Sequence, residues 1–208
     1  MFSLYLTIYL FCKHYFLIVF RLIITTYQQL LKSMKKKSIE ELNRPDNETY
    51  KQTEKLSFVV ILDSVRSLNN IGSVFRTSDA FLVERILLCG ITATPPSPEI
   101  HKTALGAEDS VKWEYYQTTQ QALTLLKEQG YTLFAIEQVE NSVMLQDVEL
   151  DKHKKYAVIL GNEVKGVQQE VVDMCDNCIE LPQFGTKHSL NVSVTAGIVI
   201  WEFFNRLK

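Results

Sequence analysis

Apolar residues occur in short continuous runs that alternate with amphipathic or polar segments along most of the chain. Such runs are typical of strands buried on both faces of a parallel sheet, and helical spacing marks many of the stretches between them. The expected strands are 57–62, 85–89, 111–116, 131–137, 155–160 and 178–181. The expected helices are 69–81, 100–105, 118–129, 168–174 and 190–204. This alternation predicts an α/β fold with a mostly parallel sheet and helices on both of its faces.

The last expected helix, 190–204, differs from the others because its apolar residues face nearly every direction around the axis. A helix that is apolar all round is buried on more than one side. In a chain of 208 residues, this predicts packing against the helix's own sheet and against a second subunit. Ser189, just before the first turn, has the chemistry of an N-cap.

The first 33 residues differ from the rest of the chain. They hold long apolar runs interrupted by Lys13, His14 and Arg21, and they contain no acidic residue. The interruptions disfavour a spanning helix, which needs about 20 mostly apolar residues, and no signal-peptide pattern is visible. We interpret Met34 as the true start. A membrane anchor or an amphipathic surface helix is the alternative.

The remaining sequence divides into a polar, basic arm at 34–56 and a domain at 57–208. Within the arm, residues 38–55 are either extended chain or a short helix leading into the domain. The formal net charge of −2 is not that of a general nucleic-acid coat. Any RNA contact would need a local basic patch, and two candidates are Lys35–Lys37 with Arg44, and Lys152 with Lys154 and Lys155. Each run is equally consistent with a solvated face.

Four cysteines are present, and two of them, Cys175 and Cys178, form a C-x-x-C pair. No second pair completes a zinc site, and the surroundings do not resemble a thioredoxin-type redox motif. We interpret the pair as two ordinary cysteines between a helix end and a strand start. Nothing in the cysteine usage demands an oxidising compartment, and we expect a cytoplasmic protein without stable membrane association.

Three segments carry candidate chemistry: 69–77, 160–166 and 181–193. Each follows an expected strand and leads into an expected helix, so a parallel sheet would bring all three to one edge. No segment has the glycine pattern of a phosphate loop or a dinucleotide site, and the G-x-S-x-G pattern is absent. His188 beside Ser189 does not form a triad, because adjacent residues rarely face each other productively.

Together these segments resemble the three motifs of the SpoU (TrmH) family of RNA ribose 2′-O-methyltransferases, within the SPOUT superfamily. The matches are Asn69-Asn70-Ile71-Gly72-Ser73-Val74-Phe75-Arg76-Thr77, Leu160-Gly161-Asn162-Glu163-Val164-Lys165-Gly166, and Leu181-Pro182 with Ser189-Leu190-Asn191-Val192-Ser193. The resemblance covers about residues 57–207. It implies a C-terminal trefoil knot, a homodimer through the C-terminal helix, and S-adenosylmethionine held in the knot.

The resemblance also assigns residues by position and implies no metal. To the reacting centre it assigns Asn70, Arg76, Glu163, Ser189 and Asn191. To the cofactor, mainly through the backbone, it assigns Glu137, Leu160, Gly161, Leu181, Pro182, Ser189 and Leu190.

Three of these residues have more than one interpretation. Arg76 is either a general base or a group that holds a phosphate and stabilises alkoxide charge; a guanidinium stays protonated, so we favour the second role. Glu163 is better explained by capping N–H groups or pairing with Arg76 than by acting as a base. Ser189 is either a helix cap or a catalytic contact.

The reaction that the resemblance implies is methyl transfer to a ribose 2′-hydroxyl of structured RNA. Transfer RNA is the first expected substrate, because small single-domain relatives often act there, and ribosomal RNA is the alternative. A non-catalytic RNA-binding protein on the same scaffold is a further alternative, which the intact motif residues disfavour.

Overall fold

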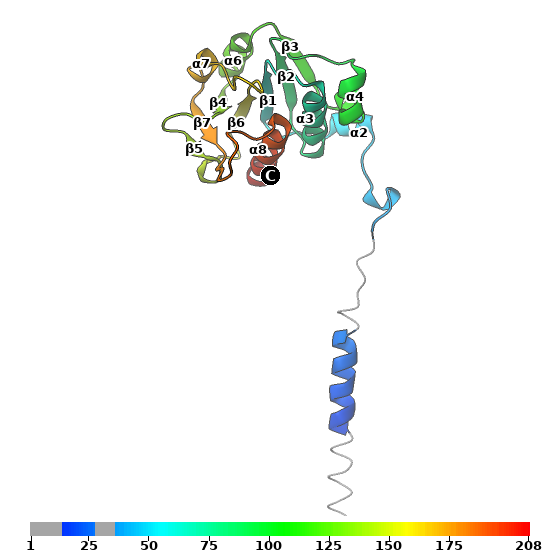
Figure 1. Cartoon of the computed structure of the whole chain (residues 1–208). Coiled ribbons are helices and arrows are strands. Elements are labelled where there is room, and N and C mark those ends of the chain that lie inside the picture. The colour runs from blue at the N-terminus through cyan, green and yellow to red at the C-terminus, as the bar shows by residue number, and fades with distance from the viewer. Residues whose placement is uncertain (1–13, 28–35) are drawn as a thin grey trace, which may run out of the picture. The chain divides into compact units, whose positions relative to one another are not determined.

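The computed structural model describes residues 14–27 and 36–208. The chain divides into two compact units, Met1–Arg44 and Pro45–Lys208 (Figure 1). The proposed start at Met34, and Lys35 of the basic arm, lie outside the described residues.

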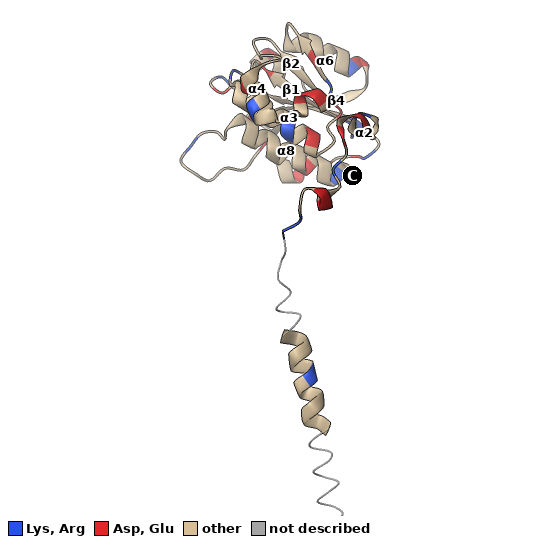
Figure 2. Cartoon of the chain, turned by 90° about the vertical axis from the view of Figure 1, so that its right-hand side faces the viewer, with Lys and Arg blue, Asp and Glu red and all other residues tan. Residues whose placement is uncertain are grey.

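In the first unit, residues 14–27 form a helix, and Glu40–Leu42 form the short 3-10 helix η1. The helix exposes most of its large apolar side chains, and it contains Arg21 but no acidic residue. Figure 2 accordingly draws most of this helix in tan. Its two threonine hydroxyls donate to main-chain oxygens one turn earlier. In the parts of the chain that are described, no helix is both long and apolar enough to cross a membrane.

The second unit is built on one seven-stranded sheet. Its strands are β1 Phe58–Asp63, β2 Arg85–Cys89, β3 Trp113–Tyr116, β4 Tyr131–Ile136, β5 Val143–Met144, β6 Lys155–Leu160 and β7 Asn177–Glu180. The strand order is β3-β2-β1-β6-β4-β7-β5, and every neighbouring pair is parallel. The parallel sheet predicted from the apolar runs is confirmed. The trefoil knot implied by the resemblance stays a prediction.

Helices cover both faces of this sheet (Figure 1). They are α2 Asn47–Gln52, α3 Leu68–Ala80, α4 Pro98–Ala104, α5 Ala107–Ser110, α6 Thr119–Glu128, α7 Gln169–Val172 and α8 Val192–Leu207, with the 3-10 helix η2 at Leu145–Asp147. Alternate residues of β1 enter two separate cores: Phe58 and Val60 pack with α3 and α8, whereas Val59 and Ile61 pack with α6 and α7. This two-sided burial explains why the strand reads as a continuous apolar run.

Two short segments need comment. Helix α2 lies within residues 38–55 and is the short helix that was one of two interpretations of this stretch; it belongs to the second unit, and its Tyr50 is 4% exposed. Residues 141–151 showed no pattern of an element, but they contain β5 and η2. Elements of two or three residues are too short to show a helical or strand period.

The start of α8 corrects the sequence prediction. The helix begins at Val192 rather than at residue 190, and its N-cap is Asn191 rather than Ser189. The Asn191 side-chain oxygen accepts from the Ser193 backbone N–H (2.9 Å) and the Ser193 hydroxyl (2.7 Å). Asparagine and serine are comparable N-caps, so residue type alone could not decide between the two positions.

Candidate active site

A pocket of about 520 Å³ opens at the carboxyl ends of β4, β6 and β7, beside the start of α8. Segments 160–166 and 181–193 both contribute to its lining. Its walls are the strand-end residues Ile136, Leu160, Ile179 and Leu181, the loop after β6, and residues 189–192 with Thr195. Parallel α/β sheets commonly place ligands at this edge.

A chain of hydrogen bonds joins the three motif segments beside this pocket. The Asn191 side-chain N–H donates to the Asn70 side-chain oxygen at 3.2 Å. The Asn70 side-chain N–H then donates to a carboxylate oxygen of Glu163, also at 3.2 Å. The prediction that these segments converge is therefore confirmed, and the chain of bonds fixes the orientation of both amides.

Glu163 caps the start of α3 rather than pairing with Arg76. Its carboxylate accepts backbone N–H bonds from Arg66 at 3.0 Å and Ser67 at 2.9 Å. Desolvation favours the neutral acid, but the donors from Arg66, Ser67 and Asn70 outweigh it, so the pKa of Glu163 lies below its ordinary value. The group is ionised at neutral pH and is a poor proton acceptor, which fits a structural role.

The loop between Gly161 and Gly166 is closed on itself. Backbone bonds of 3.0 and 2.9 Å link Asn162 and Gly166 in both directions. The Asn162 side-chain oxygen accepts from the Val164 and Lys165 N–H groups, and its amide donates to the Ser64 carbonyl at 2.8 Å. Gly166 has φ +68°, which favours glycine.

Two carboxylates hold the end of this loop in place. Glu137 accepts the Val167 N–H at 2.9 Å. Asp63, which is 1% exposed, accepts the Gln168 backbone N–H at 3.3 Å, the Gln168 side-chain N–H at 3.1 Å and the Thr119 hydroxyl at 2.6 Å. By residue type and position alone, Asp63 has the character of an ordinary loop residue. The signal that could have found it is an acid at the end of a fully apolar strand.

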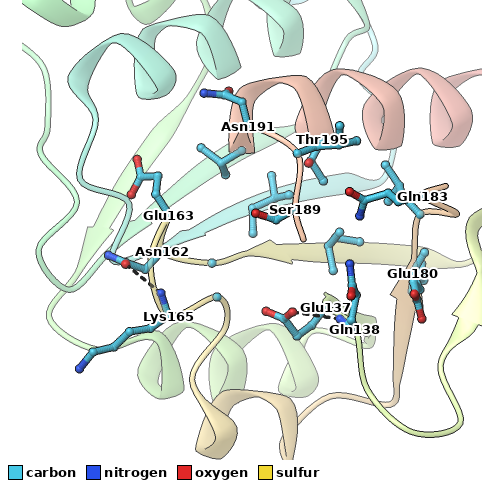
Figure 3. A pocket seen from close by; sticks show the side chains of 18 of the residues that line it. Glu137, Gln138, Asn162, Glu163, Lys165, Glu180, Gln183, Ser189, Asn191 and Thr195 are labelled. Atoms are coloured by element: carbon cyan, nitrogen blue, oxygen red, sulfur yellow. Dashed lines mark hydrogen bonds between the residues drawn. The ribbon is translucent and has the colours of Figure 1, made fainter. Parts of the chain in front are cut away.

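The predicted site residues fall into two groups, according to whether they line the pocket. Those that line the pocket are Glu137, Leu160, Gly161, Glu163, Leu181, Ser189, Leu190 and Asn191. Asn70, Arg76 and Pro182 do not line it. Arg76 is exposed on α3, and its guanidinium makes no hydrogen bond or ion pair with any residue in the described ranges. In Figure 3, Asn191 and Glu163 lie on one side of the pocket, and Glu137 and Gln138 on the other.

The pocket lining is acidic. It contains three carboxylates, from Glu137, Glu163 and Glu180, and one cationic side chain, Lys165. Apolar strand ends form the floor between them. This combination suits a ligand with an apolar body and positive charge, and it opposes a ligand whose recognition depends on phosphates.

The fold and the pocket together define an α/β domain that carries the motifs of an RNA methylase at the edge of the sheet where the pocket lies. A model of the SpoU rRNA Methylase family matches residues 57–201. The chain belongs to this family.

Similar proteins support this family assignment. A tRNA/rRNA methyltransferase of Borreliella burgdorferi, itself described as uncharacterized, is 31% identical over 163 residues, which cover 77% of this chain and 69% of that protein. Staphylococcal relatives assigned to the TrmH family are 30% identical, and the matches span 61% to 63% of their length. The chain thus spans under two thirds of several curated relatives.

Two solved structures have the same fold. The TrmH/SpoU tRNA modifying enzyme of A. aeolicus aligns with a TM-score of 0.68 and 26% identity, over 77% of this chain and 81% of that one. The AdoMet-bound rRNA methyltransferase of Sinorhizobium meliloti aligns with a TM-score of 0.68 and 25% identity, over 76% of this chain and 60% of that one.

Proposed function

We propose that the protein transfers a methyl group from S-adenosylmethionine to a ribose 2′-hydroxyl of RNA, with tRNA as the first substrate and rRNA as the second. The observation that carries this proposal is the hydrogen-bond chain from Asn191 through Asn70 to Glu163, at the edge of an acidic pocket. Family membership supports it, as do the names of the similar tRNA and rRNA enzymes.

The chemistry of the pocket fits S-adenosylmethionine. That molecule carries a sulfonium and an ammonium, and it would supply an electrophilic methyl group. The three pocket carboxylates complement its positive charge. The backbone at Leu160, Gly161, Leu181 and Leu190 would hold it, and the apolar strand ends would cover its base. Phosphate-bearing cofactors lack this complementarity.

The chain's own residues have three tasks in this reaction. Asn70 and Asn191 orient the ribose through amides that are already fixed by their mutual bond. Glu163 keeps Asn70 and the start of α3 in place. Arg76, which remains charged, holds a phosphate and stabilises negative charge on the 2′-oxygen. The proton of that hydroxyl passes to solvent water as the methyl group is transferred, and S-adenosylhomocysteine is released.

The direct test is methyl transfer from labelled S-adenosylmethionine to separated tRNA and rRNA fractions, followed by nuclease mapping. We expect label in the tRNA fraction at a nuclease-resistant site, because a 2′-O-methyl group blocks cleavage at that ribose. Label only in the rRNA fraction would show that the substrate is rRNA rather than tRNA. Cofactor binding without label in either fraction would favour the non-catalytic alternative, and absence of cofactor binding would contradict the proposal.

We further propose that the protein is a homodimer through α8. This helix leaves a stripe exposed, in which Val194 is 50%, Ile198 41% and Trp201 50% exposed, and Leu190, just before the N-cap, is 42% exposed. The first three recur at helical spacing and lie on one side of the helix. Helix α3 runs alongside α8 (Figures 1 and 2), and Phe81, just beyond the end of α3, contacts Trp201 with ring centroids 5.3 Å apart.

Placing a charge in this stripe should break the dimer. We expect Ile198→Glu to halve the mass measured by analytical ultracentrifugation, because burying an unpaired carboxylate in an apolar interface is costly. Ile91→Glu is the matched control, since Ile91 is 68% exposed and lies in the loop after β2 rather than on α8. A wild-type protein that sediments as a monomer would contradict the proposed dimer.

The proposed location is the cytoplasm. Three cysteines in the described part of the chain, Cys89, Cys175 and Cys178, are free thiols. Burial raises the pKa of Cys89 and of Cys175 to about 12, so these thiols are protonated and unreactive at neutral pH. Free, inert thiols fit a reducing compartment.

A further inference from the structure

One side chain in the loop that leads from the pocket to α8 is unusually exposed. Phe184, in the loop between β7 and α8, has 96% of its surface accessible, more than any other large apolar residue of the described chain. A single exposed apolar residue is ordinary by itself. Phe184 differs because of where its loop is attached and what else the loop carries.

Both ends of this loop form part of the pocket. Leu181 and Gln183 line it at one end, and Ser189 and Leu190 line it at the other. The Gln138 side chain adds a further attachment, donating to the His188 carbonyl at 3.0 Å. The ends of the loop are therefore fixed to the site where the reaction takes place.

The tip of the loop projects away from the domain. Phe184, Gly185, Thr186 and Lys187 are all exposed. A Cβ atom added to Gly185 would meet nothing within 4 Å. The tip thus presents an aromatic face and a cation, on a loop whose two ends line the pocket.

We propose that Phe184 stacks on an unpaired base of the RNA substrate while Lys187 contacts its phosphate backbone, so that the enzyme selects nucleotides outside duplexes. This inference rests on the proposed function. An aromatic ring can stack on any base, but only one that is not already stacked in a helix. The ribose hydroxyl itself is accessible in an RNA duplex, so the requirement for an unpaired nucleotide comes from Phe184.

The charge of the protein favours such a contact. The chain has a formal net charge of −2, and three carboxylates line the pocket. Phosphates are therefore not drawn strongly to the site, and stacking supplies attraction that does not depend on charge. A second copy of the chain is a poorer occupant for this tip, because Lys187 and His188 beside it are polar and exposed, unlike the apolar stripe of α8.

The test compares RNA binding by the full-length protein and its variants, loaded with S-adenosylhomocysteine so that no turnover occurs. The probes are a labelled synthetic RNA hairpin with an unpaired loop and the blunt duplex of the same stem, at one fixed salt concentration. We expect Phe184→Ala to weaken hairpin binding by about 5- to 150-fold. Duplex binding and S-adenosylmethionine affinity should stay unchanged. Phe184→Trp should restore hairpin binding, and Ile91→Ala, the exposed aliphatic control, should have no effect.

Three results would overturn the inference. They are wild-type hairpin affinity in Phe184→Ala, an equal loss on hairpin and duplex, and a change of oligomeric state in Phe184→Ala, which would assign the ring to a protein interface. Failure of the proposed function would look different: the wild type would transfer no methyl group, while hairpin binding would still depend on Phe184.

Discussion

Gly161→Ala is expected to remove most of the affinity for S-adenosylmethionine and to lower the free energy of unfolding by about 1–3 kcal/mol. A Cβ atom at this position would lie 2.1 Å from the Gly166 carbonyl carbon and 2.2 Å from the Val167 nitrogen. Both are backbone atoms, so no side chain can rotate away to relieve the overlap. The loop must move, although Asn162, Glu137 and Asp63 hold it from three sides.

Displacing this loop also moves the pocket wall. Gly161 lines the pocket together with the backbone that is proposed to hold the cofactor, so the displacement should weaken cofactor binding. Isothermal titration with S-adenosylmethionine and denaturant unfolding measure the two effects separately.

Gly185→Ala is the matched control for both measurements, because its added methyl group meets nothing within 4 Å. It should change neither cofactor affinity nor stability by more than about 0.5 kcal/mol. Gly161→Ala with wild-type affinity for S-adenosylmethionine would show that the pocket is not the cofactor site.

The sequence predicts the fold well where burial is strong. Strands β2 and β6 begin and end at the predicted residues, because runs such as 155–160 are apolar enough to be buried on both faces. Short pieces such as α5 and β5 have too few residues to show a period. The α8 cap was misplaced because Asn191 and Ser189 are both good caps, and the bond to Asn70 that holds Asn191 joins residues 121 positions apart.

The candidate site could likewise be predicted only in part. The convergence of Asn70, Glu163 and Asn191 could be predicted from the sequence, because each follows a strand of one parallel sheet and the motifs resemble those of a known family. The hydrogen bonds by which Asp63 and Asn162 hold the loop after β6 could not be predicted, because the residues they bond are about 100 positions away in the chain. Such contacts depend on the loop conformations at the sheet edge, which residue type does not specify.

Arg76→Ala is expected to lower kcat/KM for RNA by about 100- to 1,000-fold while leaving the affinity for S-adenosylmethionine and the stability unchanged. The guanidinium is exposed and contacts no acidic group in the described ranges, so its removal breaks no structural interaction. It lies six residues beyond Asn70 on α3, about 9 Å along the helix axis, and outside the lining of the monomer's pocket. Because α3 runs beside the exposed stripe of α8, the proposed dimer is what would bring Arg76 to a reacting centre.

Two further variants define what Arg76 does. Arg76→Lys keeps the charge but loses the planar fork that binds phosphate at two points, so it should recover only part of the activity. Lys127→Ala removes an exposed helical cation from α6, on the other face of the sheet, and should have no effect on activity. Methyl transfer retained by Arg76→Ala would remove the residue from the mechanism. A loss in kcat/KM together with unchanged cofactor affinity and sedimentation would place its action on the RNA, because neither the pocket nor the dimer would have changed.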